Sequence, residues 1–130
     1  MIRQPLVSII IAHWNGEEII KDCLESLSKT TYENYEVIVV DNASTDNSVK
    51  IITENFPNIK IVQNNKNYGF AGGNNIGYNH AKGEIILLLN NDTNVEPDWL
   101  ENLVKFSLDN PQVGILQPKI KSLILMCSVS

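Results

Sequence analysis

The sequence predicts an α/β domain built around a three-layer, mostly parallel sheet. Short β-branched runs alternate along the chain with amphipathic segments of helical length. Most of these runs are apolar throughout, as in strands covered on both faces. The chain has 130 residues, of which 43% are hydrophobic and 19% charged. These values fit one globular domain and exclude a disordered or coiled-coil protein.

The strands and helices are expected in strict alternation. Ser44 and Thr45 precede the second helix as N-cap residues, and Pro97 with Asp98 begins the fourth. Gly83 follows the third helix as a stop signal. Parallel strands joined by helices imply right-handed crossovers. The expected strands are residues 6–12, 36–40, 59–63, 84–89 and 113–117, and the expected helices are residues 17–28, 46–55, 71–81 and 98–108.

The charge balance argues against a nucleic-acid partner. Fifteen acidic residues exceed ten basic ones, for a formal net charge of −5, and the basic residues are scattered singly along the chain. A protein that neutralises a phosphate backbone needs clustered Lys and Arg. Any phosphate ligand must therefore be held by backbone N–H groups or by a metal.

The cysteines and the apolar stretches bear on redox state and location. Cys23 falls on an apolar helical stripe, which predicts a reduced core thiol, and its spacing from Cys127 matches no metal motif. No secretory signal is found, and no apolar stretch reaches the roughly 20 residues of a membrane span. We therefore expect a cytoplasmic protein, either free or at the inner face of the membrane.

Three polar clusters follow the first, second and fourth expected strands. They are His-Trp-Asn-Gly at residues 13–16, Asp-Asn-Ala-Ser-Thr-Asp at residues 41–46, and Asn-Asn-Asp-Thr at residues 90–93. The carboxyl ends of parallel strands meet at one edge of the sheet, where open α/β folds bind their ligands. The clusters together predict a binding site at that edge.

Each side chain in these clusters allows a structural and a functional interpretation. Asp41 either sets a turn through its own backbone or accepts an N–H group of a pyrimidine base. Asp92 either belongs to a turn or binds Mg²⁺ or Mn²⁺, with substrate phosphates completing the coordination shell. Trp14 either packs in the core or covers a base. His13 and Asp46 are expected to be structural, with Asp46 in the first turn of the second helix.

A glycine-rich segment, residues 67–75, opens the third helix. It either presents N–H groups to phosphate or forms a tight loop with a cap. Its spacing fits neither the GxGxxG fingerprint of dinucleotide-binding folds nor the GxxxxGK pattern of P-loops. An NAD enzyme is therefore disfavoured, and so is a nucleotidyltransferase, which would carry a glycine-rich basic loop after the first strand.

Three stretches taken in order resemble the family 2 glycosyltransferases of the GT-A fold. They are VSIIIAHWNG, VIVVDNASTDNS and NYGFAGGNNIGYNHAKGEIILLLNNDT. The parts NYGFAGGNN and LLLNNDT are most similar to the rhamnosyltransferase-like branch. The resemblance covers residues 5 to about 121. It implies a nucleotide-sugar-binding domain over residues 1–121, incomplete at its C-terminus, and an atypical tail over residues 122–130.

The resemblance implies transfer of a sugar from a UDP- or dTDP-sugar to a hydroxyl of a saccharide or lipid-linked acceptor, with inversion at the anomeric carbon. Asn90-Asn91-Asp92 matches the family's DxD motif, which puts Asn91 near the ribose and Asp92 on a divalent metal, Mn²⁺ or Mg²⁺. Trp14 matches the aromatic residue on the base, and Asp41 matches the residue that reads it. The expected nucleotide-binding residues are Ala12, Trp14, Asn15, Asp41, Gly73, Asn74 and Asn91.

The catalytic base is expected beyond residue 130. In the family a carboxylate beyond the DxD region takes the proton of the acceptor hydroxyl. Here Glu96, Asp98 and Glu101 lie too near the metal motif and look like helix-start residues. The chain is thus expected to be the donor-binding half of a longer enzyme. The alternative is a truncated, inactive fragment that binds nucleotide-sugar or only metal, and the oligomeric state is left open.

Overall fold

The computed structural model describes residues 3–110 and, beyond them, the strands within residues 115–116, 119–120, 123–124 and 126–129. Strands and helices alternate up to residue 109, as the sequence predicts. In chain order the elements are β1 (Val7–His13), α1 (Glu17–Leu27), β2 (Tyr35–Asp41), α2 (Ser48–Asn55), β3 (Lys60–Gln63), α3 (Gly69–His80), β4 (Ile85–Leu88), α4 (Trp99–Asp109), β5 (Ile115–Leu116), β6 (Lys119–Ile120), β7 (Leu123–Ile124) and β8 (Met126–Val129).

The main sheet has the strand order β3-β2-β1-β4-β8-β5. The strand β1 is central and pairs in parallel with β2 on one side and with β4 on the other. The strand β3 continues the parallel sheet beyond β2. The register aligns Val7 with Tyr35 and with Ile85, and it brings His13 beside Asp41 at the far end. The last residues of β1 and β2 are therefore neighbours.

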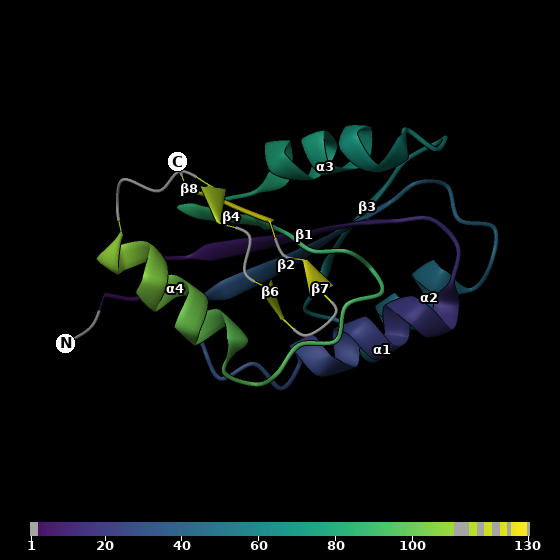
Figure 1. Ribbon diagram of the computed structural model, residues 1–130. Helices are drawn as coiled ribbons and strands as arrows, with labels where there is room; N and C mark the ends of the chain where they lie inside the picture. Colours follow the sequence, from purple (N-terminus) through teal and green to yellow (C-terminus); the bar gives the residue numbers. More distant parts are fainter. Residues whose placement is uncertain (1–2, 111–114, 117–118, 121–122, 125, 130) are drawn as a thin grey trace.

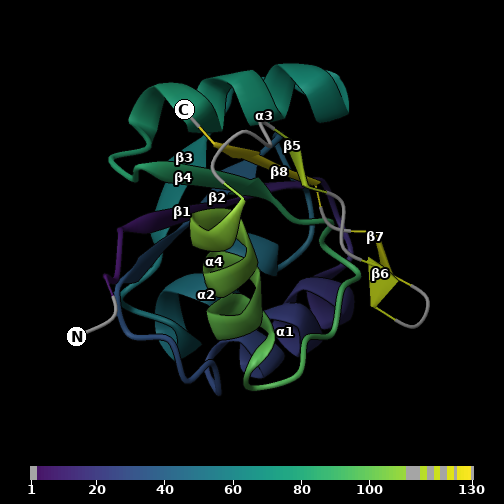
Figure 2. The same cartoon turned by 60° about the vertical axis from the view of Figure 1, so that its left-hand side comes forward.

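Helices cover both faces of the sheet, which confirms the expected three layers. Figures 1 and 2 show α3 alone on one face and α1, α2 and α4 on the other. The larger core cluster, on the side of α1, α2 and α4, contains Ile9 and Ile11 of β1, whereas Ile10 belongs to the cluster beneath α3. Alternate residues of β1 thus enter different cores, and this explains why its sequence is apolar without interruption.

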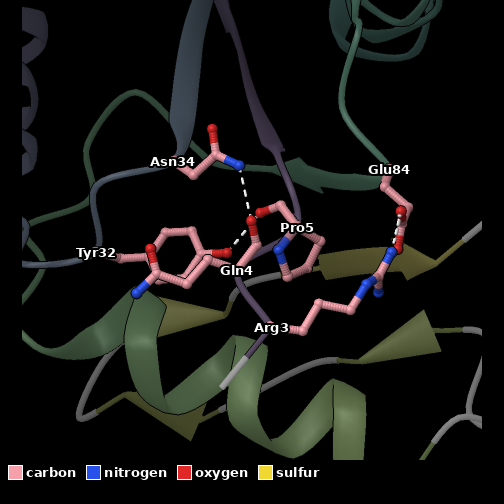
Figure 3. A network of polar contacts seen from close by, with 6 residues as sticks. All are labelled: Arg3, Gln4, Pro5, Tyr32, Asn34 and Glu84. Atoms are coloured by element: carbon pink, nitrogen blue, oxygen red, sulfur yellow. Dashed lines mark hydrogen bonds and ion pairs between the residues drawn. The ribbon is translucent and has the colours of Figure 1, made fainter. Parts of the chain in front are cut away.

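The segment that precedes β1 is tied down by the segments that precede β2 and β4 (Figure 3). The Tyr32 hydroxyl donates to the carbonyl oxygen of Pro5, and Asn34 Nδ2 donates to the carbonyl oxygen of Gln4 over 2.7 Å. Arg3 forms an ion pair with Glu84. These contacts fix where β1 starts relative to its two partners.

The structure differs from the sequence prediction at the end of the chain. The strand expected at residues 113–117 is observed as Ile115–Leu116, and residues 113, 114 and 117 lie outside the described residues. This strand does not pair with β4. Instead β8 lies between them and is antiparallel to both. The domain boundary expected at residue 121 stays a prediction.

Two expected helix signals have other roles in the structure. The N-cap residue of α2 is Asn47, not Ser44 or Thr45, because the side chains of those two residues are hydrogen-bonded to the end of β2 and the loop after β1. Gly83 does not stop α3, which ends at His80. A Cβ at Gly83 would meet the backbone nitrogen of Ser8 at 2.6 Å, so glycine is needed there for close approach between segments.

The glycines of α3 let this helix lie close against the sheet. A Cβ at Gly77 would overlap Ile10 Cγ2 and lie 3.0 Å from Val40 Cγ2. A Cβ at Gly73 would lie 3.0 Å from the Cβ of Ala12. The helix therefore packs backbone to side chain over β1 and β2, and its N-terminal end is held at the carboxyl edge of the sheet.

We predict that Gly77→Ala lowers the free energy of unfolding. Overpacking costs about 1–3 kcal/mol, which outweighs the gain of about 1 kcal/mol in helix propensity. Asn79→Ala is the matched control, because Asn79 is exposed on the same helix and its replacement brings only a propensity gain. Urea denaturation of both variants measures the difference. A Gly77→Ala protein as stable as the wild type would contradict this packing.

Candidate functional site

The three polar clusters predicted from the sequence lie at one edge of the sheet. Parallel pairing puts the carboxyl ends of β1, β2 and β4 on the same side. The order β3-β2-β1-β4 means that the chain builds outward in one direction to β3 and then returns to the other side of β1. Such a reversal of strand order opens a crevice that binds ligands in α/β proteins.

The loops after β1 and β2 are bonded into one unit. The backbone nitrogen of Thr45 donates to Asn15 Oδ1 over 2.8 Å, and the backbone nitrogen of Asn15 donates to Ser44 Oγ over 2.9 Å. Asn15 and Ala43 have left-handed backbones, with φ of 46° and 63°. The side chain of Asn15 therefore holds the loop, and its role toward a nucleotide stays a prediction.

Asp41 forms the turn that its structural interpretation predicts. Its carboxylate is 3% exposed and accepts hydrogen bonds from the backbone nitrogen of Ser44 at 3.0 Å and from Ser44 Oγ at 2.6 Å. A carboxylate has about four lone-pair positions, so Asp41 can still accept a further N–H group. The neighbouring Trp14 is 52% exposed, which excludes the core interpretation for its ring.

The sequence predicts Asp46 in the first turn of the second helix, but the residue precedes α2, which begins at Ser48. Its structural role is also larger than expected. Its Oδ2 accepts the backbone N–H groups of Gly16 and Glu17 at the start of α1. Its Oδ1 accepts the backbone N–H and the hydroxyl of Ser48 at the start of α2. Burial raises the pKa of Asp46, but these hydrogen bonds lower it, and the net pKa lies below its ordinary value. One carboxylate thus caps two helices.

Asn42 is a further organising residue that the sequence analysis did not identify. Its side chain is buried, donates to the carbonyl oxygen of Gly69 over 3.1 Å and accepts from Asn64 Nδ2 over 2.9 Å. It therefore fixes the start of α3 to the end of β2. Its position as the second polar residue after an apolar strand is the one sequence signal for this role. The partners of Asn42 lie more than twenty residues away in sequence, so the pattern does not predict them.

The glycine-rich start of α3 reaches the same edge. Gly73 faces Ala12 and Asn42, so the structure brings two of the expected nucleotide-binding residues together. The next residue, Asn74, is 6% exposed, and within the described part of the chain its Oδ1 has no hydrogen-bond partner. A buried amide oxygen without a donor costs free energy, about 1–3 kcal/mol.

The Asn-Asn-Asp turn follows β4 and is held from two sides. Asn91 Nδ2 lies 3.0 Å from His13 Nδ1 at the end of β1. The thiol of Cys23 in α1 donates to the carbonyl oxygen of Asn90. Burial raises the pKa of Cys23 to about 12, and this free, buried thiol confirms the expected core role. Asp92 is exposed at the end of the turn.

A metal at this edge would have few protein ligands. Among the described residues no group of three or more His, Cys, Asp or Glu side chains is arranged to hold a metal ion. The exposed carboxylate of Asp92 offers one ligand position. This fits Mg²⁺ or Mn²⁺ bound through one carboxylate and substrate phosphates, and it does not fit a site built from protein ligands alone.

The acidic residues after the turn belong to the start of α4. Asp98 is the N-cap residue of α4, and Glu101 lies in its first turn, as the sequence predicts. Glu96 is exposed just before them. The described residues of this region thus supply no buried carboxylate that resembles a catalytic base.

The opposite end of the sheet carries a cavity of about 450 Å³ between α1, α2 and the start of β2. Leu24, Val37 and Phe56 are among the residues that line it. No Lys or Arg is among its lining residues, so it offers no positive side chain to a diphosphate. The cavity is therefore not the ligand site that the polar clusters indicate.

Comparisons with known proteins show to which family this chain belongs. The fold is that of an α/β protein with a candidate site at the carboxyl edge of its parallel strands. The domain of Glycosyl transferase family 2 matches residues 8–122. The chain therefore belongs to this family. In addition, no helix among the described residues has the length and apolar character needed to cross a membrane.

Relatives and solved structures agree with this assignment. An uncharacterized glycosyltransferase of Haemophilus influenzae is 33% identical over 112 residues, covering 84% of this chain and 35% of the relative. The mannosyltransferase PcManGT of Pyrobaculum calidifontis, in complex with GDP-Man and Mn²⁺, has a TM-score of 0.84 and 29% identity, covering 92% of this chain and 36% of its own. TarS of S. aureus, residues 1–349 in complex with UDP, has a TM-score of 0.79 and 30% identity, covering 88% and 35%.

These matches show that the fold is the N-terminal portion of a GT-A glycosyltransferase. The chain spans about a third of the length of the relatives described above. The match to residues 8–122 includes all three polar clusters and the glycine-rich segment. The site therefore lies within the region that the family shares.

We predict that Asp46→Asn destabilises the protein at neutral pH by about 1 kcal/mol for each helix that Asp46 caps. The native pKa of Asp46 lies below its unfolded value near 3.8, so its charge stabilises the fold above that value. This stabilisation is lost as the pH falls through the native pKa. The gap between wild type and variant should therefore close in urea denaturation at low pH.

Asp22→Asn is the control for this experiment, because Asp22 is exposed on α1 and caps neither helix. Its stability should follow the wild type at every pH. A gap for Asp46→Asn that stays constant down to pH 2 would show that the charge of Asp46 is not what holds the two helices.

Proposed function

We propose that residues 1–121 are the nucleotide-sugar-binding domain of an inverting glycosyltransferase. The observation that carries this proposal is the convergence of three family motifs at the reversal point of the sheet. The loops 13–16 and 41–46 are bonded to each other, and the turn 90–93 contacts the first of them through His13. Open α/β sheets bind nucleotides at this kind of edge.

The donor is a UDP- or dTDP-sugar in this proposal. Trp14 covers the base with its exposed ring, and Asp41 accepts an N–H of the pyrimidine through a lone pair that Ser44 leaves free. Asn91 lies at the ribose. The loop and helix residues Ala12, Asn15, Gly73 and Asn74 complete the site in this proposal.

A divalent cation, Mn²⁺ or Mg²⁺, would be held by Asp92 together with the diphosphate. When bound, it supplies Lewis-acid stabilisation of the leaving nucleoside diphosphate. Such a cation would neutralise the diphosphate, because the chain has a net charge of −5 and no cluster of basic residues to bind phosphates. The PcManGT complex with GDP-Man and Mn²⁺ supports this part of the proposal.

The acceptor is a saccharide or lipid-linked hydroxyl, as in cell-wall or polysaccharide synthesis, and the enzyme belongs to a rhamnosyltransferase-like branch. We propose a cytoplasmic location, free or at the inner face of the membrane. The assignment to this branch rests on the motifs NYGFAGGNN and LLLNNDT. The base that deprotonates the acceptor is placed beyond residue 130.

A second candidate is a fragment that binds nucleotide-sugar or only metal without turnover. Two observations favour it for the chain alone. The chain spans about a third of its relatives' length, and the described residues after the Asn-Asn-Asp turn offer only exposed carboxylates, at the start and at the end of α4. Titration with UDP separates a fragment that binds only metal from the first candidate. A glycosyl-transfer assay with an added acceptor separates a chain with turnover from one that only binds nucleotide-sugar.

We predict that UDP binds the folded chain in the presence of Mn²⁺. Asp92→Asn should weaken this binding by about tenfold or more, the loss expected when a charged ligand contact is removed, but only when Mn²⁺ is present. Asp41→Asn should weaken it with and without metal, because the base contact does not involve the cation. Isothermal titration with UDP, dTDP and GDP measures these effects and ranks the bases.

Glu96→Gln is the matched control for Asp92→Asn. It removes one exposed carboxylate four residues away and should leave the affinity for UDP with Mn²⁺ unchanged. Absence of binding by a wild-type chain that is folded by circular dichroism would contradict the proposed function of this chain.

We also predict that Mn²⁺ and UDP bind cooperatively. A single exposed carboxylate supplies too few ligands, so Mn²⁺ alone should bind only weakly, and added UDP should tighten the affinity for Mn²⁺ by about tenfold or more through its phosphate oxygens. Electron paramagnetic resonance of free Mn²⁺ follows both titrations. Tight Mn²⁺ binding without nucleotide would show that the metal site is built from protein ligands.

A further inference from the structure

His13 joins two of the loops that form the candidate site. It is the last residue of β1 and only 1% exposed. Its Nδ1 lies 3.0 Å from Asn91 Nδ2 in the turn after β4, and its Nε2 lies 2.8 Å from Ser48 Oγ at the start of α2. The two ring nitrogens therefore contact different parts of the chain, the turn after β4 and the start of α2.

The donors in this chain of contacts point in one direction. An amide NH₂ group can only donate, so Asn91 donates and His13 Nδ1 accepts. The ring proton therefore sits on Nε2 and is donated to Ser48 Oγ. The Ser48 hydroxyl donates in turn to Asp46 Oδ1, whose other oxygen receives the backbone N–H of Gly16. A carboxylate at one end thus fixes the orientation of an amide at the other.

We propose that His13 is a positioning residue that fixes the side-chain amide of Asn91 for nucleotide binding. The inference rests on the proposed function, in which Asn91 lies at the ribose. With Nδ2 held by His13, the Oδ1 of Asn91 takes no hydrogen bond within the described part of the chain. An acceptor oxygen in one fixed orientation suits the hydroxyl donors of a ribose. Fixing the amide beforehand removes part of the entropy cost of binding.

The neutral state of the ring supports this arrangement. A charged imidazolium would direct an Nδ1–H group at the amide NH₂ of Asn91, so that two donors would face each other. Burial lowers the pKa of His13, and Asp41 and Asp46, the charged groups that act on the ring, raise it by less. The pKa therefore lies below its ordinary value, and the ring is an acceptor at Nδ1 at neutral pH.

Two substitutions at His13 separate positioning from stability. His13→Asn can place an amide oxygen where Nδ1 lies and still accept from Asn91, but it is too short to reach Ser48. His13→Gln can reach Ser48 but leaves Asn91 without its acceptor. We expect UDP affinity with Mn²⁺ to fall about tenfold in His13→Gln and to stay within about twofold in His13→Asn, as for partners that orient ligand-binding groups.

The thermal stability of the two variants is the readout that a merely structural role would move. If His13 only supported the fold, UDP affinity would follow the melting temperature of each variant. We expect the opposite pattern, with affinity following the contact to Asn91. Combining His13→Gln with Asn91→Ala should cause no further loss of affinity beyond Asn91→Ala, because both changes remove one interaction. Additive losses would overturn the proposal.

A measurement on the free wild-type protein keeps the proposal testable if a variant fails to fold. The ¹⁵N spectrum of the His13 ring should show the proton on Nε2 and an unprotonated Nδ1. A proton on Nδ1 would overturn the proposal. Absence of UDP binding by the wild type would overturn the proposed function and this inference with it, whereas equal affinities in His13→Gln and His13→Asn would overturn the inference alone.

Discussion

The parallel pairing of β1 with β2 on one side and with β4 on the other is the constraint on which the site depends. It places the ends of three strands at one edge, although their sequences are separated by roughly 30 and 50 residues. Burial fixes this pairing, because Ile9 and Ile11 enter one core and Ile10 enters the other. A shift of β1 by one residue would exchange these two sets of side chains.

The polar residues at this edge divide into those that hold the loops and those that stay open. The side chains of Asn15, Asn42 and Asp46 form hydrogen bonds with the loops and helix starts around them. Trp14 and Asp92 are exposed. Asp41 and His13 belong to the first group, because they are buried and hydrogen-bonded, although they lie next to the open residues. A rigid scaffold of the first kind lets a few exposed groups bind a ligand with little reorganisation.

Much of this arrangement could be predicted from the sequence, because the strands are uninterrupted apolar runs and the polar clusters come directly after them. The sequence also places Asp98 correctly at the start of α4. It could not predict the double capping by Asp46 or the bridging by Asn42, since both depend on partners from other loops. Ser44 and Thr45 were wrong as helix caps for the same reason. Local preference favours a cap, but Asp41 and Asn15 provide stronger tertiary partners.

In the proposed function, the carboxyl edge of β1, β2 and β4 is the nucleotide site and the cavity at the other end of the sheet is not. Amide chemical-shift mapping of the ¹⁵N-labelled chain with UDP and Mg²⁺ tests it most directly. We expect the amide chemical shifts to change only at residues 12–16, 41–46, 67–75 and 90–93. Shifts centred instead on the cavity residues Leu24, Val37 and Phe56 would contradict it.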